Sequence, residues 1–165
     1  MSSRTSDLHG AAWRLCLLIA LAAPLVCGCI SMEVPKDFLV LEEGASSFKA
    51  VSPDEARIWV RKFKDPLEGD LSFWAGVLRQ DFVTNRGYTL VEERTVKGPE
   101  DRDSHEFIFE TMVQGAPHRY LVSVFIVEGW LWFANKIYVT EFVAEKALFE
   151  KDLEAVRKAI LTVEP

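Results

Sequence analysis

The stretch "HRYLVSVFIV", residues 118–127, decides the fold of this chain. Successive side chains of a β-strand point to opposite faces of its sheet, and in this stretch both faces are largely apolar. A strand of this kind lies inside a sheet that is covered on both sides. The remaining sequence must therefore supply further strands beside this one and a helix for each face.

Strand patterns occur on both sides of this central stretch. "HEFIFETMV" alternates Phe107 and Phe109 against Ile108, and the short connector after it, "QGAP", suits a hairpin. "SPDE" before residue 56 has the form of a helix capping box, but β-branched and aromatic residues follow it, so we interpret it as a turn. The predicted strands besides 118–127 are 47–51, 56–63, 88–96, 105–113 and 136–144, with a further short strand after Asp37.

Two helices are predicted from apolar residues at helical spacing. The first covers 71–86, where Asp70 can cap the start and Gly87 can adopt the left-handed conformation that ends a helix. Its stripe is Leu71, Trp74, Ala75, Leu78 and Phe82. The second covers 145–163 and is amphipathic. Its stripe is Phe149, Leu153, Val156 and Ile160.

The predicted fold class is α+β, with an antiparallel sheet of about six strands flanked by two helices in an α/β/α sandwich. The element order, with "YLVSVFIV…KIYVTEFVA…FEKDLEAVRKAI", resembles the PsbP-like fold family, which includes small bacterial lipoproteins. The resemblance covers residues 47–165 and implies a single globular domain, here bounded as 37–165. It also implies binding or assembly more often than catalysis, although fold alone does not define function.

The first 28 residues have the layout of a secretory signal. Arg4 and Arg14 precede an apolar run of twelve residues, 15–26, which as a helix covers roughly 18 Å and is too short for a bilayer core of about 30 Å. The alternative is a buried N-terminal helix, which Pro24 and the lack of a polar face disfavour. We therefore expect residues 1–28 to be a signal peptide.

All three cysteines lie in or next to this segment, at positions 16, 27 and 29. "VCGC", Val26 to Cys29, resembles the lipobox of bacterial lipoproteins, which implies signal cleavage between Gly28 and Cys29 and acyl chains on Cys29. The alternative is a C-x-C metal or redox pair, for which the later sequence offers no cysteine and two histidines as further ligands.

Lipidation of Cys29 would make the membrane a partner through the acyl chains. We expect residues 29–36 to form the lipidated cysteine and a short tether that reaches at most roughly 25 Å. Ile30 stands where an Asp would favour retention in the inner membrane, so the resemblance implies the periplasmic face of the outer membrane.

The net charge argues against two kinds of partner. The chain has 19 basic and 25 acidic residues, and removal of residues 1–28 takes away Arg4, Arg14 and Asp7, which leaves 17 and 24 and a net charge of −7. Nucleic-acid binding needs a basic surface, and docking on anionic lipid headgroups also needs positive charge. We expect neither, and an envelope protein remains the candidate macromolecular partner.

Few residues suggest chemistry after the signal segment. His105 and His118 are interpreted as solvated edge residues in preference to catalytic bases. Glu100, Asp101 and Asp103 carry oxygen ligands suited to Ca²⁺, but Arg102 interrupts them and a solvated hairpin is preferred. The sequence therefore predicts no enzyme, no metal site and no cofactor.

"EGWLWFANK" joins two strong strands and contains Trp130, Trp132 and Phe133. These aromatics are either core, which we prefer, or an exposed patch for a partner or membrane. The leading hypothesis is a lipid-anchored, non-enzymatic binding or assembly module of the bacterial cell envelope. Two alternatives remain open: a carrier of a small apolar ligand held between sheet and helix, and a hydrolase whose site is not recognised.

Overall fold

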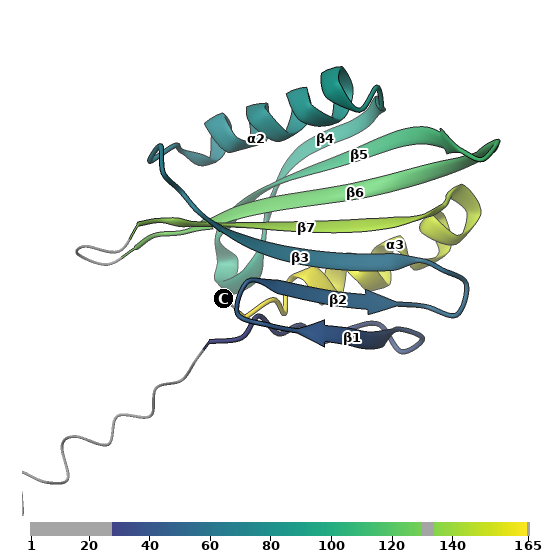
Figure 1. Ribbon diagram of the computed structural model, residues 1–165, viewed down its shortest axis with the longest axis horizontal. Coiled ribbons are helices and arrows are strands. Elements are labelled where there is room, and N and C mark those ends of the chain that lie inside the picture. The colour runs from purple at the N-terminus through teal and green to yellow at the C-terminus, as the bar shows by residue number, and fades with distance from the viewer. Residues whose placement is uncertain (1–27, 130–133, 165) are drawn as a thin grey trace, which may run out of the picture.

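The computed structural model describes residues 28–129 and 134–164. These residues form seven strands and two α-helices (Figure 1). Their order is β1 (Leu39–Glu43), β2 (Ser47–Val51), β3 (Arg57–Lys64), α2 (Leu71–Gln80), the π-helical turn η2 (Asp81–Asn85), β4 (Thr89–Lys97), the 3₁₀ turn η3 (Pro99–Asp101), β5 (Asp103–Val113), β6 (Ala116–Val127), β7 (Lys136–Glu145) and α3 (Lys146–Ile160). The α+β class is confirmed, with seven strands in place of about six.

All seven strands form one antiparallel sheet in the order β1-β2-β3-β7-β6-β5-β4. The crossover from β3 to α2 and β4 places the second half of the sheet on the far side of β7, so β3 pairs with the last strand of the chain. The further short strand predicted after Asp37 is β1, which pairs with β2 and forms one edge of the sheet. Strand β4 forms the other edge. The sequence 118–127 becomes β6, an interior strand with side chains in both cores.

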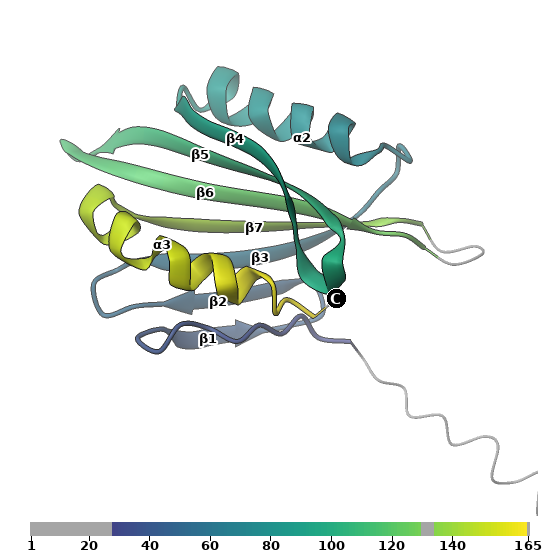
Figure 2. The same cartoon turned by 180° about the vertical axis from the view of Figure 1, so that it is seen from behind.

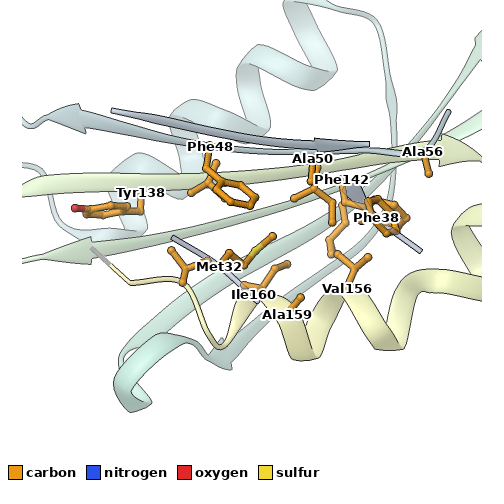
Figure 3. Close-up of a cluster of buried hydrophobic side chains, with 14 of the residues drawn as sticks. Met32, Phe38, Phe48, Ala50, Ala56, Tyr138, Phe142, Val156, Ala159 and Ile160 are labelled. Carbon is orange, nitrogen blue, oxygen red and sulfur yellow. The ribbon is translucent and has the colours of Figure 1, made fainter. Parts of the chain in front are cut away.

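The two helices cover opposite faces of the sheet (Figures 1 and 2). On the α3 side, the core runs from Phe48 of β2 and Ile58 of β3 through Phe142 of β7 to Ile108 of β5. Figure 3 shows part of it, with Phe48 and Phe142 of the sheet and Val156 of α3. On the α2 side, the core is smaller and centres on Phe82, Phe107 and residues of β6 and β7. The two-faced strand predicted from the sequence therefore separates two distinct apolar layers.

Local sequence explains where α2 begins and ends. The Asp70 carboxylate accepts a hydrogen bond from the Phe73 N–H at 2.7 Å, which caps the first turn. The helix continues into η2, and Gly87 follows with φ +72°, in the left-handed region that favours glycine. The predicted helix over 71–86 is thus a ten-residue α-helix extended by a π-helical turn.

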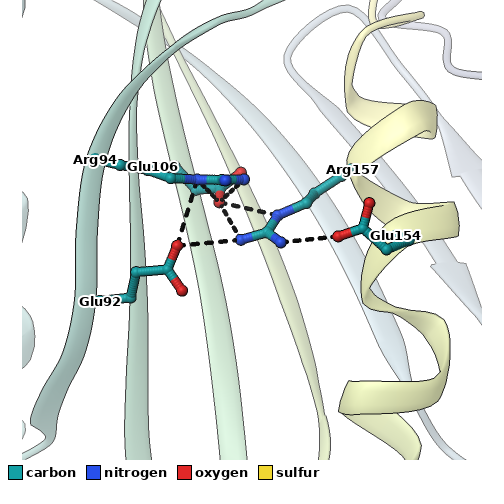
Figure 4. A network of polar contacts seen from close by, with 5 residues as sticks. All are labelled: Glu92, Arg94, Glu106, Glu154 and Arg157. Carbon is teal, nitrogen blue, oxygen red and sulfur yellow. Dashed lines mark hydrogen bonds and ion pairs between the residues drawn. The ribbon is translucent and has the colours of Figure 1, made fainter.

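A polar network fastens α3 to the β4–β5 side of the sheet (Figure 4). The buried Glu106 of β5 accepts hydrogen bonds from Arg94 of β4 and from Arg157 of α3, at 2.7 and 2.8 Å. Arg157 also pairs with Glu92 and Glu154. Partial burial lowers the pKa of Arg157, but the hydrogen bonds that it donates to Glu106 and Glu154 outweigh this and raise the pKa overall. The network therefore satisfies a carboxylate that the sheet would otherwise bury without a partner.

The N-terminal segment differs from the tether expected over residues 29–36. Ile30 and Met32 are buried in the α3-side core, and Ser31 forms a β-bridge with Glu164. The folded domain thus begins at residue 30, because the alternating apolar residues of this segment have a partner surface at the C-terminal end of the chain. No helix within residues 28–129 and 134–164 is long and apolar enough to cross a bilayer.

Candidate functional site

The α2 side of the sheet is covered over only part of its width. Trp59, Arg61 and Phe63 of β3 stand on this side, because they are paired with Glu141, Val139 and Ile137 of β7, two of which lie in the α2-side core. In the described part of the chain, α2 packs on β5 and β6 and leaves this side of β1–β3 without a helix (Figure 1). We call this area the open face. Its residues are Leu39, Glu42, Ser47, Lys49, Val51, Arg57, Trp59, Arg61 and Phe63.

Cations and aromatic rings alternate along the centre of the open face. The Lys49 Nζ lies 5.2 Å from the Trp59 ring centroid, and the Arg61 Cζ lies 4.3 Å from that ring and 5.5 Å from the ring of Phe63. Trp59 and Phe63 nevertheless remain 38% and 43% exposed. Because cation–π contacts restrain long side chains, the aromatic edges are held in place while still reachable from solvent.

The β1 side of the open face is polar and internally paired. Lys49 forms an ion pair with Glu42 at 2.7 Å, and the Ser47 hydroxyl donates to the other carboxylate oxygen of Glu42 at 2.6 Å. The hydrogen bond from Lys49, followed by that from Ser47, lowers the pKa of Glu42. Glu42 is therefore ionised at neutral pH and neutralises the lysine beside the tryptophan.

Two arginines and a nearly buried carboxylate form the border with the helix-covered part. Glu141 of β7 pairs with Arg61, and its other oxygen lies 3.9 Å from the Arg86 Nη1. Arg86 stacks over Phe82 at 4.0 Å and pairs with Asp81 at 2.8 Å. A hydrogen bond from Asn85, and then one from Arg86, lowers the pKa of Asp81. The π-helical turn thus positions Arg86 beside the open face.

This arrangement suits binding of a surface that is partly apolar. Tryptophan, phenylalanine and arginine are enriched in the parts of interfaces that contribute most binding energy. The cations at its centre and border already have carboxylate partners, so the open face offers aromatic surface and directed polar groups with little net charge. It matches a protein surface better than a polyanion.

His105 and His118, the two histidines considered as candidate bases, lie far apart in the structure. In the sheet register, His105 lies opposite Val124 and His118 lies opposite Thr111, six positions along the strands, or about 20 Å. His105 stacks on Phe107, and its Nε2 lies 3.3 Å from Glu93, whereas the His118 ring bonds the Ala116 carbonyl at 3.1 Å. They therefore do not share one site.

The acidic hairpin consists of locally paired charges. Glu100 pairs with Arg102, and Asp103 pairs with Lys97 at 2.7 Å. Among the residues that the structure describes, no three histidine, cysteine, aspartate or glutamate side chains are grouped to hold a metal ion. The carboxylates of this hairpin instead neutralise neighbouring cations.

The remaining predicted sites lie at or beyond the limits of the described residues. Gly28 and Cys29 are exposed and immediately precede the buried Ile30. Trp130, Trp132 and Phe133 lie outside the described residues, so their role as core or contact stays a prediction.

A surface hollow lies between α2 and the edge strand β4. It has a volume of about 780 Å³, and its apolar lining includes Phe73, Val77, Val83 and Leu90. Phe73, Val77 and Val83 are exposed, although they belong to the helical segment that also supplies the α2-side core. This hollow is the feature closest to the ligand space between sheet and helix that the carrier hypothesis requires.

Sequence reasoning missed the open face. The sequence does show that Trp59 and Phe63 alternate with Ile58 and Val60, with Arg61 between the two aromatics. This pattern indicates a strand with aromatic side chains on one side. It does not reveal which side of β3 is covered, because that depends on the pairing of β3 with β7 and on the position of α2. The site therefore became visible only with the strand order.

Comparisons with known proteins give information on the fold. No family model and no curated protein sequence matches the chain. A solved structure of LpqN, described as involved in cell envelope biogenesis of Mycobacterium tuberculosis, has a TM-score of 0.64 and 13% identity, over 82% of this chain and 83% of that one. PA94 of Pseudomonas aeruginosa, a protein of unknown function described as a putative regulator, has a TM-score of 0.51 and 15% identity, over 84% and 98%. The chain therefore shares its fold with an envelope-associated protein and with a protein of unknown function.

Proposed function

We propose that this protein is a non-enzymatic binding or assembly module of the bacterial cell envelope, anchored by acyl chains on Cys29. The observation that carries the proposal is the open face, where half-exposed Trp59 and Phe63 are held by paired cations on the part of the sheet that α2 leaves uncovered. Its partner is an envelope protein whose surface is partly apolar, because such a surface gains most from covering aromatic side chains.

Two further observations support an envelope location. The sequence 26–29 resembles a lipobox, and the fold is similar to that of a protein described as involved in envelope biogenesis. With Ile30 after the lipidated cysteine, the periplasmic face of the outer membrane is the proposed site. The PsbP-like resemblance agrees with a module of this kind.

Site-specific photo-cross-linking in intact cells tests the proposal. A photoreactive residue at Phe63 of the full chain is expected to capture an envelope protein, whereas the same residue at Met112, which is 64% exposed and lies away from the open face, is expected to capture none. Equal capture from both positions, or capture from neither, would contradict the proposed surface. A hydrolase activity that is lost on changing His105 or His118 would contradict the non-enzymatic role.

Lipidation has its own test. Cys29→Ser is expected to abolish incorporation of labelled palmitate, while Cys27→Ser leaves it unchanged. The opposite result would move the modified residue to Cys27.

A carrier of a small apolar ligand is the second candidate, and the apolar hollow between α2 and β4 favours it. Native mass spectrometry of the purified protein distinguishes the two functions. A co-purifying lipid or metabolite that disappears in Val77→Asp, but not in Phe63→Ala, would support the carrier function. A ligand-free protein that still cross-links through Phe63 supports the assembly module.

A further inference from the structure

The segment that follows Cys29 is part of the folded domain. Ile30 is fully buried, Met32 is nearly so, and Val34 packs against the same core, while Glu33 between them is exposed. This alternation is that of a strand with one buried side. The chain is therefore held by side-chain packing from the first residue after the cysteine.

Hydrogen bonds fix the same segment at both of its sides. The Ile30 N–H donates to the Gly44 carbonyl at 2.9 Å, in the connection between β1 and β2. On the other side, the Glu164 N–H donates to the Ser31 carbonyl at 3.0 Å, and the Glu33 N–H donates to the Thr162 hydroxyl at 2.9 Å. The segment is thus joined to a hairpin and to the chain that follows α3.

These contacts lie at one end of the strands, which we call the anchor end. The Lys62 N–H bonds the Ser46 carbonyl, and Lys64 pairs with Lys136, so the β1–β2 hairpin lies near the end of β3 and the start of β7. Figure 1 shows the N-terminal end of the described chain at this end of the sheet, beside the C-terminus. The β5–β6 hairpin at residues 113–116 lies at the opposite end of the sheet.

We propose that the anchor end lies directly against the lipid headgroups, with no tether between the acyl chains and the domain. The inference rests on the proposed lipidation of Cys29. One residue of chain spans about 3.6 Å, against roughly 25 Å for a free segment of seven residues. Because Ile30 cannot leave the core without losing its packing and its hydrogen bond to Gly44, the anchor fixes the position of the whole domain.

Charge does not provide this contact. Glu33, Glu100, Asp101 and Glu164 are exposed near the N- and C-terminal segments that form the anchor end. Carboxylates are repelled by anionic headgroups, so proximity to the bilayer comes from the covalent anchor and from the packed segment. The proposed contact therefore depends on the covalent anchor and the packed segment, and not on attraction between charges.

The open face is then held at a defined height. Phe63 lies opposite Ile137, close to the anchor end. Trp59 lies four residues earlier in β3, about 13 Å farther from the anchor end. A partner of the open face is consequently one that extends only a short distance from the membrane surface.

Energy transfer from a label on the domain to an acceptor lipid tests the proposal. The full chain is matured in bacterial cells and kept in isolated membranes. The label is attached to a single cysteine introduced by Leu161→Cys or by Met112→Cys. Leu161 lines the same surface hollow as Ser31 and is 50% exposed, and Met112 lies next to the distant hairpin. We expect strong transfer from position 161 and weak transfer from position 112.

A matched variant carries a flexible Gly-Ser insertion between Cys29 and Ile30, which leaves the packed segment intact. We expect the difference between the two positions to be lost in this variant, with no change in thermal stability. Equal transfer from both positions in the native sequence, or an insertion without effect, would overturn the proposal. Recovery of the uninserted protein in the soluble fraction would instead overturn lipidation of Cys29, so the two failures are distinguishable.

Discussion

The two sides of the sheet are built from the same strands but have different degrees of cover. On the α3 side, Phe48, Ile58 and Val60 of β2 and β3 are fully or almost fully buried under α3 and the N-terminal segment. On the other side, the intervening residues Lys49, Trp59 and Phe63 remain accessible. The comparison teaches that β2 and β3 need only one covered side to be stable, which leaves the other side available for binding.

A matched pair of phenylalanines gives the largest expected contrast. Phe142 is fully buried on the α3 side and stacks on Phe149 with ring centroids 5.1 Å apart. We expect Phe142→Ala to lower the free energy of unfolding by about 3–5 kcal/mol, because it leaves a cavity in the core. Phe63→Ala on the open face should cost less than about 1 kcal/mol. Denaturant unfolding measures both, and equal losses would contradict the difference between the two sides.

The next largest loss of stability is expected when a buried side chain of the N-terminal segment is removed from the α3-side core. Ile30→Ala should cost about 2–5 kcal/mol, since a fully buried aliphatic side chain is lost. Leu39→Ala, in an exposed residue of β1, is the control and should have little effect. A thermal melt in which Ile30→Ala matches the unaltered protein would show that the segment does not contribute to stability.

The network around Glu106 should have an intermediate effect. Glu106→Gln keeps the shape but removes the charge that Arg94 and Arg157 share, which should cost about 1–3 kcal/mol. Glu154→Gln removes only the exposed partner of Arg157 and should cost less than about 0.5 kcal/mol. If the two variants unfold at the same denaturant concentration, α3 is held by apolar packing alone.

On the open face, Trp59→Ala should separate binding from folding. We expect a loss of at most about 1 kcal/mol in stability, the scale of a cross-strand contact, together with loss of the protein captured by cross-linking at position 63. Met112→Ala serves as the exposed apolar control and should retain capture. A Trp59→Ala protein that unfolds at much lower temperature would assign Trp59 to the core.

The smallest effect concerns Tyr120, at the α2-side core. Burial, and then the hydrogen bond with Tyr88, raises the pKa of Tyr120 to about 12 from an ordinary value of 10. Because the folded state holds this proton more tightly, the associated stability is complete below about pH 10 and is lost as pH rises through about 12. Burial also raises the pKa of Tyr138, so tyrosinate absorbance should show a late-titrating component that shrinks in Tyr120→Phe. Titration of all tyrosines near pH 10 would contradict this.

Local patterns predicted much of the fold. Asp70, Gly87 and the apolar spacing predicted the first helix, and the structure has α2 and η2 at this place. The features that sequence reasoning missed depend on distant parts of the chain. Ile30 and Met32 alternate with Ser31 and Glu33 like a strand, but Ser31 and Glu33 bond to Glu164 and Thr162, more than 100 positions later. Likewise, the aromatic residues of β3 are evident in the sequence, but only the pairing of β3 with β7 decides which side of β3 is exposed.

The contact between Ser31 and Glu164, 133 positions apart, also sets the order in which the fold is completed. The bridge from Ser31 to Glu164 cannot form until the last residues have been made, and α3 and β7 are likewise needed to close the core over β3. Long-range closures of this kind slow folding, because chain entropy is lost before the contacts form. We expect this delay to keep the polypeptide unfolded, and so fit for translocation, until its C-terminus is available, as the secretory signal predicted over residues 1–28 requires.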